Sequence, residues 1–291
     1  MVGASVGVAA GEEVRHDFGL VAASDGTAAA RPARREWSSG VHRALSQSPT
    51  MPATGYHVLL DFDGTVAPDD PTDRLLERFA DPAWRCIEAE WQAGRVTSRE
   101  CMQRQAALLR ATPRQLDAAI RAVQIDPAVP RFIAFCRRQG IEVTIVSDGF
   151  DRVVGTALRQ ANLPVRFFAN ALEWQGKDRW RLALPHCRSD CRTGAANCKC
   201  AHGAWDQGRS IVIGDGRSDF CMAARAGFVI AKGALAEFCR ARGLPHAAFS
   251  NFAEATWRLA EWLDLQSDGA VARAAVRRRG QFRSRRASST S

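Results

Sequence analysis

Lysine is scarce in this chain, and long apolar runs are missing. Lys177, Lys199 and Lys232 are the only lysines among 40 basic residues. Where arginine is the default cation, a retained lysine suggests that a compact point charge is needed at that position. No stretch reaches the roughly 18 consecutive apolar residues typical of a membrane-spanning helix. The sequence therefore argues against a helical membrane protein and predicts no membrane partner.

A secretory signal is missing as well. The short apolar stretch at 6–10 lacks a basic flank and is followed at once by Glu12 and Glu13. The nine cysteines are an odd number, which does not suit a complete set of disulfides. We therefore predict reduced thiols and a cytoplasmic location.

The two ends of the chain lack the apolar pattern of a packed core. Residues 1–50 are rich in alanine, glycine and serine and show no sustained periodicity. Residues 270–291 contain seven arginines and no acid, and they supply most of the formal net charge of +9. We predict disordered segments at 1–50 and 266–291. The basic tail also suggests a rival function class, non-specific binding of nucleic acid.

The most informative motif follows an apolar run at 58–60 and reads Asp-Phe-Asp-Gly-Thr over 61–65. Two carboxylates at a buried strand end are costly, so such a pair usually faces a cation, shares protons or lies at a solvated strand mouth. Alternate side chains of a strand point the same way, and Gly64 permits a sharp turn. This geometry suits Asp61 as a nucleophile and Asp63 as a proton carrier. An ordinary Asp-Gly turn is the alternative.

Two later apolar runs also end in small polar residues. Residues 141–146 lead into Ser-Asp-Gly at 147–149, and residues 210–213 lead into a glycine-aspartate motif at 214–219, with Lys199 between them. Ligands of open α/β sheets bind beyond the carboxyl ends of the strands, so the three strand tips predict one shared site. This ordered set of motifs favours a catalytic site over an ordinary Asp-Gly turn. Nucleic-acid binding would not explain the set.

The apolar pattern predicts an α/β fold with a doubly wound parallel sheet. Strands are expected at 57–61, 141–146, 210–214, 228–230 and 247–249, with a strand or hairpin region at 164–184. Helices are expected at 127–139, 150–161, 218–226, 233–242 and 252–264.

Residues 71–123 show helical spacing directly after the first motif. Helix starts are expected at Asp81-Pro82, at Thr97 and at Thr112-Pro113. We predict a small helical cap at 71–123 and a catalytic core at 57–70 and 124–265. The alternative is that these helices merely complete the core.

The chain resembles the haloacid dehalogenase (HAD) superfamily of phosphatases over roughly residues 57–264. The motifs of that family occur in order, as Asp61-x-Asp63-Gly-Thr65, Ser147, Lys199 and Gly214-Asp215-x3-Asp219. The resemblance implies a HAD-like Rossmannoid core of the phosphoserine phosphatase-like branch. Residues 81–84 and 146–150 look most like methionine-salvage methylthio-ketopentenyl phosphate phosphatases and the related phosphoethanolamine and phosphocholine phosphatases. Asp148 replaces a glycine common in phosphoserine phosphatase, and it would repel a carboxylated substrate unless it is turned away.

The resemblance implies a role for each motif residue. Asp61 would attack phosphorus and become an aspartyl phosphate, and Asp63 would protonate the leaving oxygen and later activate water. Ser147 and the amide of Gly149 would hold phosphoryl oxygens. Lys199 would neutralise the negative charge shared by Asp61 and the phosphoryl group.

Mg²⁺ would be held by Asp61, the carbonyl of Asp63 and Asp215, while Asp219 would orient a metal-bound water. Mg²⁺ prefers a few carboxylate oxygens with waters and substrate phosphate, which an aspartate-rich site without histidine supplies. The predicted function is Mg²⁺-dependent hydrolysis of a small phosphorylated metabolite. A phosphomutase or phosphotransferase of the same superfamily is the alternative, because it uses the same aspartyl phosphate.

Four cysteines crowd around Lys199, namely Cys187, Cys191, Cys198 and Cys200. Thiolates at this density could bind Zn²⁺, although the spacing lacks the paired Cys-x2-Cys of common structural zinc sites. A cysteine-rich loop that presents Lys199 is the alternative. We predict no specific nucleic-acid partner, because a zinc knuckle would leave the strand-tip motifs unexplained.

Overall fold

The computed structural model describes residues 55–203, 205 and 208–267. The extension expected at 1–50 lies outside this part, and so does the expected tail apart from its first two residues. Within this part of the chain, no helix is both long and apolar enough to cross a membrane.

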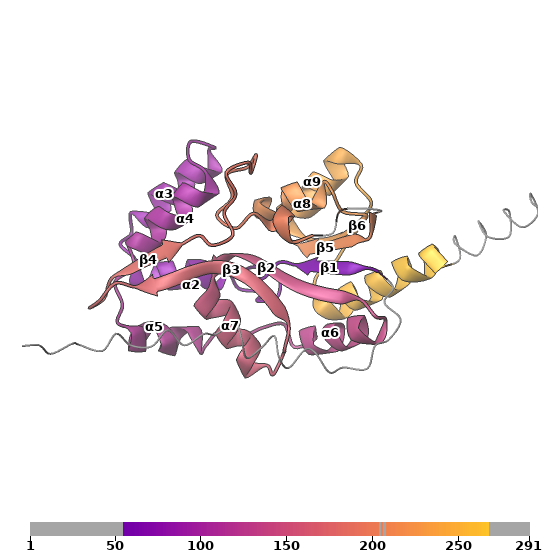
Figure 1. The fold of residues 1–291 in the computed structure, drawn as a ribbon, viewed down its shortest axis with the longest axis horizontal. Helices are drawn as coiled ribbons and strands as arrows, with labels where there is room; N and C mark the ends of the chain where they lie inside the picture. Colours follow the sequence, from indigo (N-terminus) through magenta and orange to yellow (C-terminus); the bar gives the residue numbers. More distant parts are fainter. Residues whose placement is uncertain (1–54, 204, 206–207, 268–291) are drawn as a thin grey trace, which may run out of the picture. The chain divides into compact units, whose positions relative to one another are not determined.

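Seven strands of the described part form one sheet in the order β4-β3-β2-β1-β5-β6-β7, with only the β3–β4 pair antiparallel (Figure 1). The strands are β1 (His57–Leu60), β2 (Glu142–Phe150), β3 (Arg166–Trp174), β4 (Trp180–Ala183), β5 (Ser210–Gly214), β6 (Phe228–Ala231) and β7 (His246–Ala248). In the register, Leu60 lies beside both Ile145 of β2 and Ile213 of β5. The carboxyl ends of β1, β2 and β5 therefore meet at one edge of the sheet.

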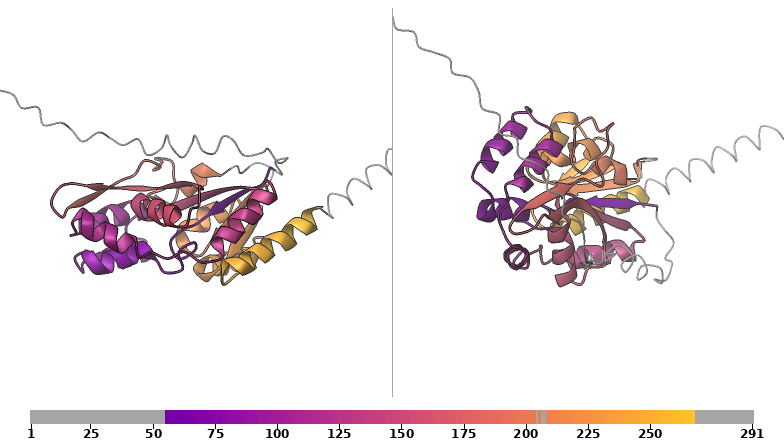
Figure 2. Two further views of the ribbon diagram at one scale, coloured as in Figure 1. Left: turned by 90° about the horizontal axis from the view of Figure 1, so that it is seen from below. Right: turned by 60° about the vertical axis from the view of Figure 1, so that its left-hand side comes forward.

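Both faces of this sheet are buried, which explains the continuous apolar runs of its central strands. Along β1, Val58 and Leu60 join one apolar cluster and Leu59 joins another, all with no exposed surface. The first cluster includes α6 (Val129–Arg138), α7 (Asp151–Gln160) and the helix at 252–267. The second includes α8 (Phe220–Ala223) and α9 (Gly233–Arg242). Helices on both faces of a mostly parallel sheet confirm the doubly wound α/β prediction (Figures 1 and 2).

The region at 71–123 contains α2 (Pro71–Phe79), α3 (Trp84–Gln92), α4 (Ser98–Ala107) and α5 (Pro113–Ile120). Two of the three expected helix starts are confirmed, because Thr97 and Thr112 each form a capping box at the start of α4 and α5. The remaining start, expected at Asp81-Pro82, corresponds to α3, which begins later, at Trp84. The Asp81 carboxylate accepts a hydrogen bond from the Ala83 amide just before the helix begins.

These helices lie on different sides of the sheet. Helix α4 packs against α3 and β4, above the sheet in Figure 1, whereas α5 packs against α7 below it. The Arg152 guanidinium of α7 lies 2.6 Å from the Asp117 carboxylate of α5. The division into cap and core stays a prediction, with α3 and α4 as the pair that stands over the strand ends.

Strand β2 runs further than the sequence indicates. The sequence predicts its end at residue 146, but the strand continues to Phe150 with an irregular register between Val146 and Phe150. A strand with extra residues bulges and re-aims its side chains. The irregular part of the strand contains Ser147, Asp148 and Gly149, which form the second motif.

Candidate active site

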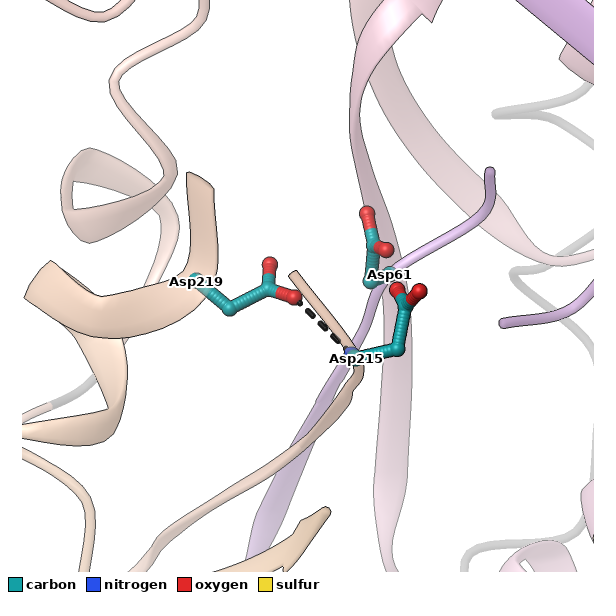
Figure 3. A group of neighbouring side chains, drawn as sticks. All are labelled: Asp61, Asp215 and Asp219. Carbon is teal, nitrogen blue, oxygen red and sulfur yellow. Dashed lines mark hydrogen bonds between the residues drawn. The ribbon is translucent and has the colours of Figure 1, made fainter. Parts of the chain in front are cut away.

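Three aspartates meet at the carboxyl ends of β1 and β5. Asp61 directly follows β1, and its amide donates to the Ile213 carbonyl of β5 at 2.9 Å. One carboxylate oxygen each from Asp61, Asp215 and Asp219 lies within 4.8 Å of the others (Figure 3). Asp61 and Asp219 are buried, and Asp215 is half-buried. The structure thus brings together three of the sequence-predicted site residues.

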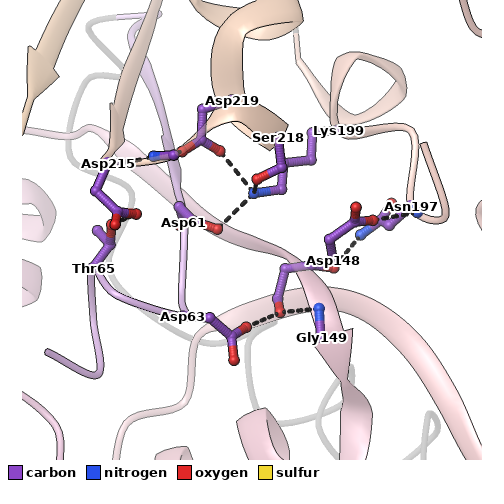
Figure 4. Close-up of polar contacts among 12 residues, drawn as sticks. Asp61, Asp63, Thr65, Asp148, Gly149, Asn197, Lys199, Asp215, Ser218 and Asp219 are labelled. Atoms are coloured by element: carbon purple, nitrogen blue, oxygen red, sulfur yellow. Dashed lines mark hydrogen bonds and ion pairs between the residues drawn. The ribbon is translucent and has the colours of Figure 1, made fainter. Parts of the chain in front are cut away.

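Lys199 lies beside two of these aspartates, Asp61 and Asp219, at the start of the short 3-10 helix η2 (Lys199–His202). Its Nζ donates to Asp61 Oδ1 at 2.6 Å and to Asp219 Oδ1 at 2.7 Å (Figure 4). A third hydrogen bond goes to Ser218 Oγ at 2.9 Å. The lysine is only 3% exposed, so its charge acts in a water-poor environment. The structure therefore places the lysine that stands between two motifs in direct contact with Asp61 and Asp219.

The excess of negative charge shifts the ionisation of the aspartates. Burial raises the pKa of Asp61 to about 7, although the Lys199 charge opposes the rise. Burial and the Asp61 charge raise the pKa of Asp219 to about 6. Burial and the Asp219 charge also raise the pKa of Asp215. One lysine does not balance three carboxylates, so this set of hard oxygen donors suits a divalent cation such as Mg²⁺.

The same charges keep Lys199 protonated. Burial alone would lower the pKa of Lys199, but the Asp219 and Asp61 carboxylates outweigh burial and raise it. The lysine therefore stays cationic across the physiological pH range.

Asp63 connects the first motif to the second motif through hydrogen bonds. Its Oδ1 accepts from Thr72 Oγ1 at 2.8 Å, and its Oδ2 accepts from Ser147 Oγ at 2.7 Å. The Gly149 amide in turn donates to Ser147 Oγ at 2.8 Å. Asp63, Ser147 and Gly149 are thus one hydrogen-bonded chain (Figure 4).

Two glycines are required by this geometry. Gly64 has φ +74, and a Cβ there would lie 2.5 Å from Asp215 Oδ2. At Gly149 a Cβ would lie 2.6 Å from Asp63 Oδ2 and 2.5 Å from Thr72 Oγ1. Any larger residue would displace a carboxylate of the site.

The turn that carries Asp215 and Asp219 is held by its own side chains. Asp219 Oδ2 accepts from the amides of Asp215 and Gly216 at 3.2 and 3.3 Å, while its Oδ1 accepts from Lys199. Thr65 Oγ1 donates to Asp215 Oδ1 at 2.9 Å. Thr65 therefore fixes the orientation of the Asp215 carboxylate from the first motif.

Asp148 is turned toward helix α4 and toward the segment just before Lys199. Its Oδ2 accepts from Ser98 Oγ of α4 at 2.5 Å, and its Oδ1 accepts from the Asn197 amide at 2.7 Å. The Asn197 side chain also donates to the carbonyls of Ser147 and Phe168. Sequence reasoning missed Ser98, Asn197 and Ser218, because ordinary polar residues in a helix or loop give no local sign of such long-range contacts.

A cavity of about 180 Å³ lies between these groups and the helices α3 and α4. Beyond the motif residues, its walls include Trp91, Met102, Gln105, Asp73 and Glu88. Burial and the charges of neighbouring acids raise the pKa of Asp73 to about 6. The lining therefore combines apolar side chains with acidic ones and with the guanidinium of Arg217, which lies over the Trp91 ring.

The cysteine cluster lies elsewhere. Cys191, Cys198 and Cys200 line a second cavity together with Cys221, whereas Cys187 is not part of its wall. Among the residues that the structure describes, only the three aspartates form a group of at least three close metal-ligand atoms. The geometry of the thiols gives no support to zinc binding.

Comparison with known proteins identifies the class. Residues 58–224 match the family described as haloacid dehalogenase-like hydrolase, and the chain belongs to this family. It is a phosphoric monoester hydrolase, and it shares its fold with solved phosphoserine phosphatases. Phosphatases of this family generally use Mg²⁺, consistent with the aspartate cluster.

Two curated relatives are similar over most of their length. Both are described as 2-hydroxy-3-keto-5-methylthiopentenyl-1-phosphate phosphatase. The protein from Geobacillus kaustophilus is 31% identical over 198 residues, which cover 66% of this chain and 90% of the relative. The protein from Brevibacillus brevis is 30% identical over 199 residues, which cover 66% of this chain and 89% of the relative. A solved structure of phosphoserine phosphatase with a phospho-aspartyl intermediate analogue shares the fold, with a TM-score of 0.54 and 18% sequence identity. The match covers 70% of this chain and 98% of the solved one.

Proposed function

We propose that this enzyme hydrolyses a small phosphomonoester in two steps, by transfer of the phosphoryl group to Asp61 and then to water. The observation that carries the proposal is the buried contact of Lys199 Nζ with Asp61 Oδ1 at 2.6 Å, beside Asp215 and Asp219. A carboxylate held this way is fixed in orientation, and its neighbouring cation can neutralise charge on a transferred phosphoryl group.

Asp63 serves as the general acid and base. It lies two residues after Asp61, and both of its carboxylate oxygens are oriented by hydroxyls of Thr72 and Ser147. In the first step it would give a proton to the leaving oxygen, and in the second it would take a proton from the attacking water. The hydroxyl of Ser147 and the amide of Gly149 would bind phosphoryl oxygens.

Asp61, Asp215 and the Asp63 carbonyl would hold Mg²⁺, with Asp219 orienting its surroundings. The ion would supply charge neutralisation for the phosphoryl oxygens. Asp219 also holds Lys199 and the turn amides, so its removal would disturb both the lysine and the Asp215 turn.

The substrate proposed first is 2-hydroxy-3-keto-5-methylthiopentenyl-1-phosphate, or a phosphate ester of similar size without a carboxylate. The activity by which both relatives are described supports this choice. Trp91 and Met102 supply apolar contact area, and sulfur and aromatic groups interact favourably. Asp73 and Glu88 also line this pocket and would repel a carboxylate, against the single guanidinium of Arg217, which disfavours phosphoserine.

A phosphate-release assay with Mg²⁺ tests this function on four esters: the ketopentenyl phosphate, phosphoethanolamine, phosphocholine and phosphoserine. We expect kcat/KM for the ketopentenyl phosphate to exceed that for phosphoserine by at least about tenfold, which corresponds to ~1.4 kcal/mol of discrimination. Phosphoserine as the best substrate would contradict the proposed substrate class. A rearranged phosphate ester in place of inorganic phosphate would indicate a mutase.

A further inference from the structure

Two thiols outside the active site lie almost in bonding contact. The Sγ atoms of Cys200 and Cys221 are 2.7 Å apart, although the residues are 21 positions apart in the chain. Cys200 belongs to η2 and Cys221 to α8, and these two elements pack together. A disulfide has an S–S distance of about 2.05 Å, so a shift of well under 1 Å would close the bond.

The surroundings allow an oxidant to reach this pair. Both cysteines are half-buried and line a cavity of about 740 Å³, separate from the pocket that contains Asp61. The wall of this cavity includes the exposed residues Arg188, Arg192 and Arg242. A cavity with exposed walls is open to small molecules.

We propose that Cys200 and Cys221 form a reversible disulfide that ties the segment of Lys199 to the segment of Asp219. A peroxide is the oxidant. One sulfur attacks the peroxide oxygen and becomes a sulfenic acid, with release of an alcohol or water. The second sulfur then attacks the first, the S–O bond breaks and the oxygen leaves as water with the remaining proton. Two thiols are oxidised, and one peroxide is reduced by two electrons.

The position of the bond determines its effect. Lys199 directly precedes Cys200, and Asp219 lies two residues before Cys221, so the disulfide would join the two segments that the Lys199–Asp219 ion pair already joins. Because the sulfurs are nearly in place, closing the bond keeps this ion pair. The oxidised protein should therefore retain its hydrolytic activity and resist unfolding better than the reduced protein.

Peptide mapping identifies the bond independently of activity. The full chain is treated with hydrogen peroxide, its free thiols are alkylated, and it is digested with trypsin without reductant. Trypsin separates Cys200 in peptide 200–209 from Cys221 in peptide 218–225, and it separates both from Cys198 in 193–199 and Cys191 in 189–192. We expect peptides 200–209 and 218–225 to be joined, and dithiothreitol to release them.

Thermal unfolding provides the second readout. We expect oxidation to raise the melting temperature by roughly 5–10 °C. Cys200→Ser and Cys221→Ser should each abolish the rise, and Cys187→Ser should retain it. Three results would overturn the proposal. They are cross-links from Cys200 or Cys221 to Cys191 or Cys198, thiols that stay unpaired after peroxide treatment, and one zinc ion per chain bound by these thiols.

Discussion

At the scale of single residues, the site depends on charge balance in a buried space. Asp61, Asp215 and Asp219 place three carboxylates close together, and one lysine contacts two of them. The sequence predicts this group because strand tips ending in aspartate converge at one sheet edge, and because lysine is rare in the chain. Local patterns did not predict Asn197 or Ser98, since their partner Asp148 lies about 50 residues from each in the chain.

Lys199→Ala should reduce turnover by about 100-fold or more, because removing a preorganised charge from a buried site costs at least that much. Lys199→Arg should also fail, since a planar guanidinium does not replace a compact ammonium between two carboxylates. Lys177 is the matched control, because it is exposed in the loop between β3 and β4. Steady-state phosphate release measures all three variants. Wild-type turnover in Lys199→Ala would show that the cation of the site lies elsewhere.

At the scale of elements, Asp148 links three parts of the fold. It stands in the bulge of β2 and accepts hydrogen bonds from Ser98 of α4 and from Asn197, two residues before Lys199. The sequence predicts β2 and α4 but not the bulge between Val146 and Phe150, because register depends on the neighbouring strand β3. The position of α5 against α7 is likewise set by tertiary contacts such as Asp117 with Arg152.

Asp148→Asn should lower the free energy of unfolding by about 1–3 kcal/mol, because an amide offers one acceptor oxygen to two donors and leaves one of them unsatisfied. Urea unfolding measures the effect. Asp190→Asn is the control, since the ion pair of Asp190 with Arg188 is exposed and its loss should change stability little. Equal stability of Asp148→Asn and wild type would mean that this link does not hold the cap helices.

At the scale of the whole molecule, the sheet brings the motifs together and buries them. Apolar runs with no exposed surface in β1 and β5 form the core, and their tips carry the carboxylates. The doubly wound class of the sheet was predictable, because strands and helices alternate along the chain. Burial of the carboxylates then couples stability to pH and to metal.

The metal-free protein should become less stable as pH rises from about 4 to about 7. The pKa of Asp61 is raised to about 7 and that of Asp219 to about 6, so the folded state holds protons that the unfolded state releases near its ordinary pKa of about 4. The free energy of unfolding therefore falls through this window. Urea unfolding in the presence of a chelator measures it, and Asp61→Asn should weaken the dependence. Saturating Mg²⁺ above this window should restore stability. A flat profile without metal would contradict the burial of these charges.

Truncation after residue 267 should leave hydrolysis unchanged, because every site residue precedes that position. The arginine-rich segment lies outside the described residues. Comparison of kcat and KM for the full and truncated chains tests this expectation. A large loss of kcat with the melting temperature preserved would show that the tail contributes to the active site.

The central claim, that Asp61 carries the phosphoryl group, is tested most directly by acid quenching of the turning-over enzyme followed by mass spectrometry. Asp61 lies in the tryptic peptide 44–74. We predict that this peptide gains one phosphoryl group, that Asp63→Asn slows turnover by about 10²–10⁴-fold, and that Asp61→Asn loses both the modification and turnover. A phosphorylated peptide 44–74 in Asp61→Asn, or wild-type turnover of that variant, would contradict the claim.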